Sequence, residues 1–370
     1  LVNRIQKKNI LLLINILRGI IENFLGGDFL IKVENLTKEF KIRKKESGLK
    51  GAFKSLFSSD FDSKTAVSNI SFEIKSGEIV GYIGSNGAGK STTIKMMTGI
   101  LTPSSGQVLV NGRVPYKERE KNAKDIGVVF GQRTQLWWDL ALSETFTILK
   151  DIYSIPDEVY EKNMNFLNKV LDLEEFMTRP VRTLSLGQRM RGDLAASLIH
   201  NPKILYLDEP TIGLDVVVKE KVRTAIKEIN KEFGTTVILT THDLSDIEEL
   251  CKRIIIIDKG TKIYDGSLDD IKKKYGYMTT LEIQSKKDFK TLLNIKEILK
   301  SESNIPIETF SSDDLSEHIE SGKLIITFNK NKITSSKIIS KVIERVDVLD
   351  FLLKESSIED IIKKIYRNEV

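Results

Sequence analysis

A glycine-rich loop between an apolar run and a helical pattern constrains the fold more than any other feature of this sequence. Residues 84–91 read GSNGAGKS and follow the apolar stretch from Ile79 to Ile83. An apolar run ending in glycine is typical of a buried strand of a parallel sheet. The loop matches in full the P-loop pattern, in which inward-turned backbone N–H groups surround phosphate oxygens. The sequence therefore predicts a strand, a phosphate-binding loop and a helix beginning near Lys90.

This loop predicts a site for ATP and Mg²⁺. Glycines are required because side chains would block the inward-facing amides, and the helix N-terminus adds its positive dipole end. We expect Lys90 to neutralise the β and γ phosphates, Ser91 to offer its hydroxyl to Mg²⁺, and Thr92 to support the α-phosphate side. The expected phosphate-binding residues are Gly84, Ser85, Asn86, Gly87, Ala88, Gly89, Lys90, Ser91 and Thr92. The alternative is a glycine-rich turn without nucleotide.

Two carboxylates close a second apolar run, ILYLDE at residues 204–209. Parallel α/β sheets bind ligands outside the carboxyl ends of their strands, so these acids should lie beside the phosphates. We expect Asp208 to bind Mg²⁺ through water and Glu209 to act as the general base that polarises the attacking water. The alternative is a pair of solvated charges.

Composition narrows the possible functions. Lys and Arg number 57 against 52 Asp and Glu, a net charge of +5, which is far below what nucleic-acid binding would suggest. A single cysteine and three histidines make a disulfide framework or a Cys/His metal cluster improbable and fit a reducing cytoplasm. No segment contains the roughly 18 consecutive apolar residues of a spanning helix.

The pattern along the chain predicts three parts. Residues 1–28 form an amphipathic, basic N-terminal extension, with a mis-set start as the alternative. Residues 29–276 alternate strands and helices, as α/β folds do, with a helical subdomain at about 133–200 and a basic insertion at 41–64. Residues 277–370 form a smaller α+β accessory domain. Its expected elements are strand 279–284, helix 287–301, strands 306–310 and 323–328, helix 334–345, strand 347–353 and helix 357–367, an order that resembles a ferredoxin-like unit.

The stretch LSLGQR at 184–189 resembles the LSGGQ signature of ABC ATPases, and its glutamine precedes Asp208 by the spacing of that family. The resemblance implies the P-loop fold of the ABC ATPase domain. It also implies that Ser185, Gly187 and Gln188 bind the γ-phosphate held by a second subunit, so that two subunits pair head to tail as a homodimer or heterodimer. Leu186 departs from the usual glycine.

Other positions match further motifs of that family in order. The resemblance implies that Phe40 stacks on adenine, where tyrosine is commoner; a core position is the alternative, with Phe53, Phe57 or Phe61 as substitutes. It implies a catalytic and Mg²⁺-sensing role for Gln132 of the glutamine loop and a nucleotide-site role for Asp215 of the D-loop. It also makes His242 the switch histidine at the γ-phosphate, so the expected catalytic set is Lys90, Gln132, Glu209 and His242.

Within the class, residues 128–140, 184–191 and 207–215 resemble bacterial ABC-2 type exporter ATPases. That implies an ATPase at the cytoplasmic face of the cell membrane that drives separate ABC-2 permease subunits, with Trp137 and Trp138 near the permease or packed in the core. The insertion 41–64 also resembles that of polysaccharide-exporting ATPases. An importer, a soluble ABC ATPase acting on DNA or ribosomes, and an ATP-binding regulator without turnover are the competing functions. No nucleic-acid partner is expected.

Overall fold

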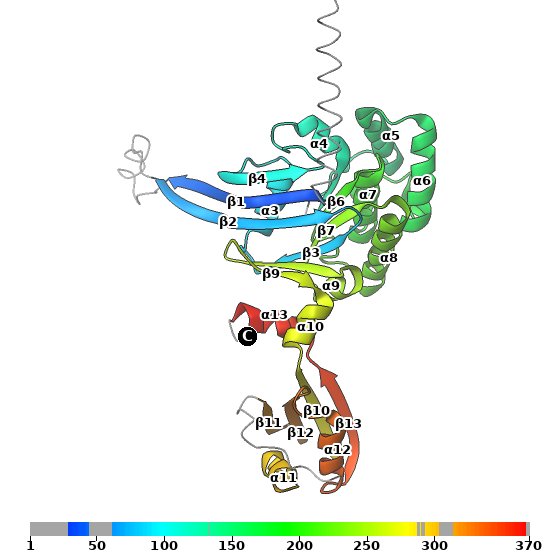
Figure 1. Ribbon diagram of the computed structural model, residues 1–370. Coiled ribbons are helices and arrows are strands. Elements are labelled where there is room, and N and C mark those ends of the chain that lie inside the picture. Colours follow the sequence, from blue (N-terminus) through cyan, green and yellow to red (C-terminus); the bar gives the residue numbers. More distant parts are fainter. Residues whose placement is uncertain are drawn as a thin grey trace, which may run out of the picture. The chain divides into compact units, whose positions relative to one another are not determined.

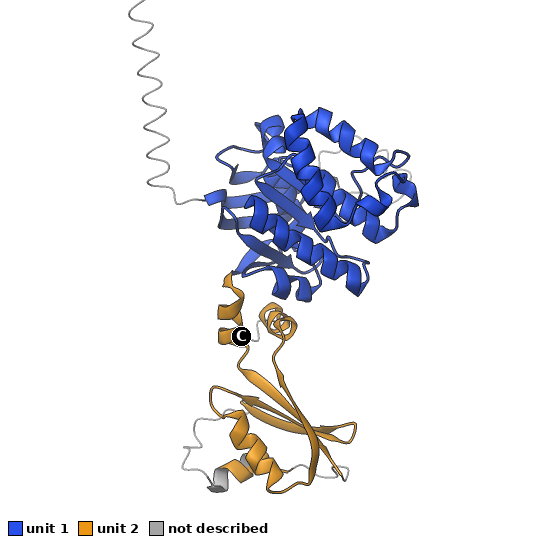
Figure 2. Cartoon of the chain, turned by 90° about the vertical axis from the view of Figure 1, so that its right-hand side faces the viewer, with its two compact units in different colours: residues 1–265 blue, residues 266–370 orange. Residues whose placement is uncertain are grey.

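The computed structural model describes residues 29–43, 61–131, 133–286, 289, 293–302 and 314–367. The chain divides into two compact units, one running to Asp265 and the other beginning at Gly266 (Figure 2). The expected N-terminal extension and residues 44–60 of the basic insertion lie outside the described residues, while 41–43 and 61–64 belong to β-strands. The boundary proposed after residue 276 falls inside the second unit.

A six-stranded sheet forms the centre of the first unit. Its strand order is β5-β6-β7-β3-β8-β9, and the pairings from β5 through β8 are parallel. The strands are β3 (Ile79–Gly84), β5 (Ile126–Phe130), β6 (Ile204–Asp208), β7 (Thr236–Thr240), β8 (Arg253–Asp258) and β9 (Thr261–Ser267). The three central strands are buried almost throughout, which explains their continuous apolar runs. This confirms the expected α/β class.

A second, antiparallel sheet packs over α3 (Lys90–Met97) in the same unit. It has the order β2-β1-β4, formed by β2 (Phe61–Lys75), β1 (Phe29–Arg43) and β4 (Ser105–Val110). One buried cluster joins Ile31 and Phe72 of this sheet, Ile94 of α3, and Tyr82 and Tyr206 of the parallel sheet. The helix that follows the phosphate loop is therefore fixed between two sheets.

The remaining helices flank these sheets. They are α4 (Arg119–Asp125), α5 (Leu142–Tyr153), α6 (Asp157–Leu171), α7 (Leu186–Leu198), α8 (Val216–Phe233) and α9 (Leu244–Leu250), with 3₁₀ turns at Glu174–Phe176 and Val181–Thr183. Figure 1 shows α5, α6 and α7 together at one end of the unit. These three helices lie in the stretch for which a helical subdomain is expected. Among the described residues, no helix combines the length and apolar character needed to cross a membrane.

The second unit contains a four-stranded antiparallel sheet with the order β11-β12-β10-β13. Its elements are α10 (Leu268–Tyr275), β10 (Met278–Ser285), α11 (Ile295–Glu302), β11 (Leu315–Glu320), β12 (Lys323–Asn329), α12 (Ser335–Ile343), β13 (Val348–Glu355) and α13 (Ile358–Tyr366). Because β12 lies between β10 and β11, the βαβ unit is split, as the expected ferredoxin-like order requires. Its core joins Leu281, Ile283 and Phe328 of the sheet to α11 and α12.

One expectation for this unit needs correction, and another lies outside the described residues. The helix expected from residue 287 begins at Ile295, because Asn294 adopts a left-handed conformation (φ 53°) that a helix cannot contain. The strand expected at 306–310 lies outside the described residues. Besides β10, the strand that pairs with β12 is β11 (Leu315–Glu320), which no expectation included.

Candidate functional site

The phosphate loop lies between the carboxyl end of β3 and α3, where its glycines meet neighbouring backbone. A Cβ on Gly84 would lie 2.6 Å from the Ile257 carbonyl oxygen, and one on Gly89 would lie 2.5 Å from that of Ala66. Gly89 also caps α3 with φ 106°, a conformation that side chains disfavour. The loop therefore needs glycine at both ends, for packing as well as for its backbone path.

The side chain of Lys90 is folded back along this loop. Its Nζ donates to the carbonyl oxygens of Gly84 at 2.7 Å and Ser85 at 3.2 Å, and the residue is buried. Burial lowers the pKa of Lys90, while the nearby Glu209 and Asp208 carboxylates act in the opposite direction. The site thus holds a desolvated cation next to two acids.

Asp208 joins the loop to the neighbouring strands. The hydroxyl of Ser91 donates to Asp208 Oδ2 at 3.0 Å, and Thr240 at the end of β7 donates to Oδ1. A hydroxyl and a carboxylate in contact are the oxygen ligands that Mg²⁺ prefers. These residues therefore fit an Mg²⁺ ion, and Thr240, which the sequence analysis missed, orients the carboxylate.

Glu209 and His242 meet at the ends of two adjacent strands. His242 Nε2 lies 2.7 Å from Glu209 Oε1. Because β6 pairs in parallel with β7, the residues that follow each strand lie side by side. Glu209 adopts a left-handed conformation (φ 57°), and its N–H donates to the Thr240 carbonyl oxygen at 2.9 Å. An acid held at a positive φ in a polar cluster is a common feature of functional sites.

The signature stretch begins α7 with a capping box. Ser185 Oγ accepts from the Gln188 N–H at 3.2 Å, and Gln188 Oε1 accepts from the Ser185 N–H at 3.0 Å. A Cβ on Gly187 would lie 2.8 Å from the Val218 side chain of α8. Glycine at this position thus permits close packing between the signature helix and α8.

Asp215 caps α8, since its Oδ1 accepts from the Val218 N–H at 2.9 Å. The ring of Phe40 is exposed rather than part of the core, with Lys38 Nζ 5.3 Å from its centroid. Gln132 lies outside the described residues. Its neighbour Gly131 donates its N–H to the Asp208 carbonyl oxygen at 2.7 Å, so the glutamine loop leaves β5 next to Asp208.

A clamp between the glutamine loop and α7 was missed by the sequence analysis. Asp193 Oδ1 accepts from Thr134 Oγ1 at 3.0 Å and from the Gln135 N–H at 2.9 Å, while Gln135 Nε2 donates to the Asp193 carbonyl oxygen at 3.0 Å. Burial raises the pKa of Asp193 to about 6. The sequence around an aspartate inside a helix does not show whether its side chain forms such bonds or faces solvent.

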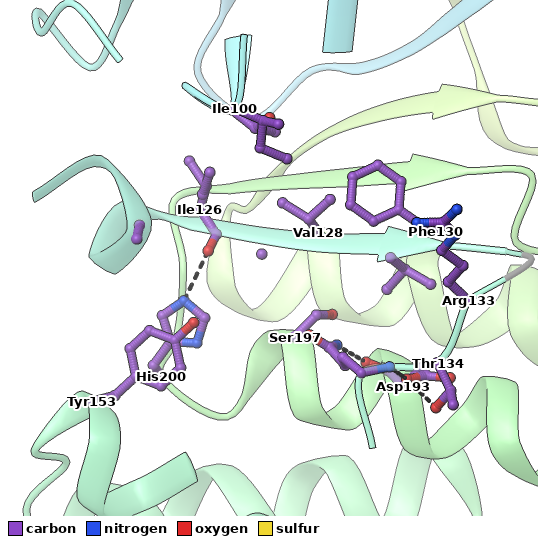
Figure 3. A pocket seen from close by; sticks show the side chains of 15 residues that line it. Ile100, Ile126, Val128, Phe130, Arg133, Thr134, Tyr153, Asp193, Ser197 and His200 are labelled. Carbon is purple, nitrogen blue, oxygen red and sulfur yellow. Dashed lines mark hydrogen bonds between the residues drawn. The ribbon is translucent and has the colours of Figure 1, made fainter. Parts of the chain in front are cut away.

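The clamp lies at one side of a cavity of about 360 Å³ between β5 and the helices. Figure 3 shows the side chains of Ile126, Val128 and Phe130 on one side of β5 and Ser197 and His200 on the other, with Asp193 and Thr134 bonded to each other. His200 Nε2 lies 3.0 Å from the Ile126 carbonyl oxygen, and its ring stacks on Tyr153. Burial lowers the pKa of His200 to about 4, so this wall of the cavity is uncharged at neutral pH.

Residues 67–212 match the sequence profile of the family described as "ABC transporter". The chain is 33% identical over 252 residues to an uncharacterised ABC transporter ATP-binding protein of Methanocaldococcus jannaschii, covering 68% of this chain and 83% of that protein. It is 35% identical to the linearmycin resistance ATP-binding protein LnrL of Bacillus subtilis, covering 60% and 71%. It is also 35% identical to the methionine import ATP-binding protein MetN of Geobacillus kaustophilus, covering 56% and 61%.

Among solved structures, the chain resembles the ATP-binding cassette MJ0796, described as a dimer in a post-hydrolysis state bound to ADP and Pi. The TM-score is 0.53 at 28% identity, and the alignment covers 64% of this chain and 98% of that one. The residues that match the family, 67–212, contain both the phosphate loop and the signature stretch. The chain therefore belongs to the ABC transporter ATP-binding proteins, ATPase subunits that pair with membrane permeases.

Proposed function

We propose that this subunit hydrolyses ATP at Glu209, and the contact between Glu209 and His242 carries the proposal. Lys90 and the amides of residues 84–92 bind the phosphates, and Phe40 stacks on the base. Ser91, Asp208 and Gln132 would hold Mg²⁺, which would supply positive charge to neutralise the phosphates. Glu209 accepts a proton from the attacking water, and His242 orients that carboxylate and contacts the γ-phosphate.

The second half of each site comes from a second subunit. Ser185, Gly187 and Gln188 start α7, whose first N–H groups have no intrahelical acceptor and suit a phosphate. Asp215 lies at the start of α8, against which Gly187 packs. Two cassettes facing head to tail would each complete the other's site, so ATP binding closes the dimer and hydrolysis reopens it.

We assign the partner to an ABC-2 type permease, with this subunit peripheral at the cytoplasmic face of the membrane. Trp137 and Trp138 are 39% and 50% exposed, and the Arg189 guanidinium lies 5.3 Å from the Trp138 ring centroid. Exposed tryptophans beside an arginine are typical anchors of protein interfaces. They come shortly after Thr134 and Gln135, which belong to the clamp and line the cavity of Figure 3, so a permease segment docked there would contact the glutamine loop.

Glu209→Gln tests the catalytic assignment, with Glu220→Gln on the exposed surface of α8 as the matched control. A positioned general base contributes roughly 10² to 10⁴ in rate, so Glu209→Gln should lower kcat by at least that lower factor while nucleotide still binds. The control should retain the wild-type rate. A Glu209→Gln variant within threefold of wild type would remove Glu209 from this role.

Transport direction is tested with a candidate ABC-2 permease that is co-expressed with this subunit. In inside-out vesicles that contain both, an exporter accumulates substrate when ATP is added outside, whereas an importer releases preloaded substrate. Neither movement, together with ATPase activity that the permease does not stimulate, would favour a soluble ABC ATPase.

A further inference from the structure

The edge strand β13 of the second unit carries apolar side chains that the unit leaves exposed. Leu349, Phe351, Leu352 and Leu353 are 56, 47, 50 and 40% exposed. On the adjacent strand β10, Leu281 and Ile283 pair with Leu353 and Phe351 and are almost completely buried. The apolar face of the sheet therefore continues from β10 to exposed side chains on β13, the strand at the edge of the sheet (Figure 1).

The backbone of β13 is also available along its outer edge. The strand pairs with β10, and within the described residues no other strand pairs with it. The N–H of Phe351 donates to its neighbour's carboxylate, Asp350 Oδ1, at 2.8 Å rather than to β10. Since amides alternate along a strand, the N–H groups of Phe351 and Leu353 face outward. An exposed apolar edge of this kind is a template for pairing with another strand.

We propose that β13 pairs antiparallel with β13 of a second copy of this chain, joining two four-stranded sheets into one. With Leu352 on the twofold axis, Asp350 of each copy lies opposite Lys354 of the other, and Phe351 lies opposite Leu353. Moving the axis to Asp350 or Lys354 would instead place like charges opposite each other. Opposite charges in direct cross-strand pairs stabilise a sheet and like charges destabilise it, so the register centred on Leu352 is favoured over these two.

The side chains fit this register. Lys354 bonds to Glu282 on β10, with Lys323 also near that carboxylate, and the partner's aspartate would approach Lys354 from the free side. Leu352 would meet its own copy between the two charge pairs. On the face covered by helices, Phe351 and Leu353 of the two copies would cover one another and extend the buried core.

This inference rests on the proposed ATP-dependent pairing of cassettes. An eight-residue edge is a small interface and should bind weakly alone. Two subunits joined there would nevertheless keep their cassettes at an effective concentration of about millimolar. The β13 contact would thus hold the cassettes together after hydrolysis has opened the nucleotide-dependent interface.

Cysteine cross-linking of the full chain tests the register. In Leu352→Cys the two thiols would face each other in a non-hydrogen-bonded pair, with Cβ atoms about 4.5–5.5 Å apart. The native Cys251 is buried and should not compete. Oxidation without nucleotide should convert most of Leu352→Cys to a disulfide dimer. In Asp350→Cys the two cysteines would not lie opposite each other, because each would face Lys354 of the other copy, so this variant should cross-link at least tenfold more slowly. Equal or absent cross-linking in both variants would overturn the proposal.

Asp350→Lys tests the charge pairing by sedimentation velocity. It would place lysine opposite Lys354 twice, so the dimer dissociation constant should rise at least tenfold, while Glu320→Lys on the opposite edge strand should leave it unchanged. A monomeric wild type, or an Asp350→Lys variant that dimerises normally, would refute the inference. Lys90→Ala separates the two proposals, since losing nucleotide binding should not affect the β13 cross-link.

Discussion

Asp193 offers a pH-dependent test of the clamp between the glutamine loop and the signature helix. It is 6% exposed, and its Oδ1 accepts from both Thr134 and Gln135. Burial raises its pKa from 3.8 to about 6, while the two hydrogen bonds and Arg189 act in the opposite direction. Desolvation is therefore the dominant effect on the pKa of Asp193. Holding the ionised carboxylate in the clamp lowers the free energy of unfolding.

The cost can be estimated from the two pKa values. Because the folded pKa is raised, the folded state binds the proton more tightly, and stability falls as pH rises from about 4 through 6. The difference corresponds to about 3 kcal/mol across the whole range, of which about 1.4 kcal/mol falls between pH 5.0 and 7.5. Asp193→Asn keeps an oxygen acceptor for both donors but cannot ionise, so it should be free of this loss.

The assay is calorimetry of wild type and Asp193→Asn at pH 5.0 and 7.5. The melting temperature of the variant relative to wild type should rise by roughly 2 °C between the two pH values, since an unfolding entropy of about 2.1 cal/mol/K per residue makes about 1.4 kcal/mol equivalent to that shift in a chain of 370 residues. Glu220→Gln, which changes an exposed carboxylate, should show no such change. If the difference between Asp193→Asn and wild type is the same at both pH values, the carboxylate is not ionised against a burial penalty.

Three further outcomes test the composite site and the unit boundary. Lys90→Ala should weaken nucleotide binding roughly 10- to 150-fold in a fluorescent-nucleotide titration, the loss expected for charge-assisted hydrogen bonds of about 1.5–3 kcal/mol; unchanged affinity would contradict the role of its ammonium. Inactive Ser185→Arg and Lys90→Ala subunits, mixed, should recover part of the ATPase activity because one site of the mixed dimer has two intact halves; no recovery in demonstrated mixed dimers would argue against shared sites. Removal of residues 277–370 should leave ATP affinity near normal but shift the monomer–dimer balance in sedimentation, whereas a folded truncation without ATP affinity would show that the nucleotide site depends on this part.

The proximity of the proposed site residues was predictable because the carboxyl ends of neighbouring parallel strands lie at the same edge of the sheet. Apolar runs placed β3, β6 and β7 in one sheet, and residues just after such strands meet at one edge. Glu209 and His242 therefore come together although 32 positions separate the ends of their strands, Asp208 and Thr240. Their contact follows from the pairing of β6 with β7. The resemblance to the ABC family, whose motifs occur in the same order, is what indicated that these two residues belong to one site.

Features that depend on side-chain detail were not predictable in the same way. The bond of Asp193 to Thr134 joins a helix to a loop 59 residues away, and an aspartate in a helix usually signals solvent. The strand β11 alternates in burial, but Glu317, His318 and Glu320 give it a polar sequence. Asn294 directly precedes α11 with a left-handed backbone, and the helical period of the sequence does not record such a departure at a single residue.

The polar groups of the proposed phosphate site bond to one another, which affects the free energy of nucleotide binding. Lys90 bonds to loop carbonyls, Ser91 to Asp208, and Glu209 to His242. Phosphate and Mg²⁺ would exchange these bonds for others, and such exchanges contribute little net free energy each. The amides of the first turn of α3 have no intrahelical acceptor, so they give the larger share. His242 would then contact the arriving γ-phosphate while it orients the Glu209 carboxylate toward water, linking catalysis to nucleotide binding.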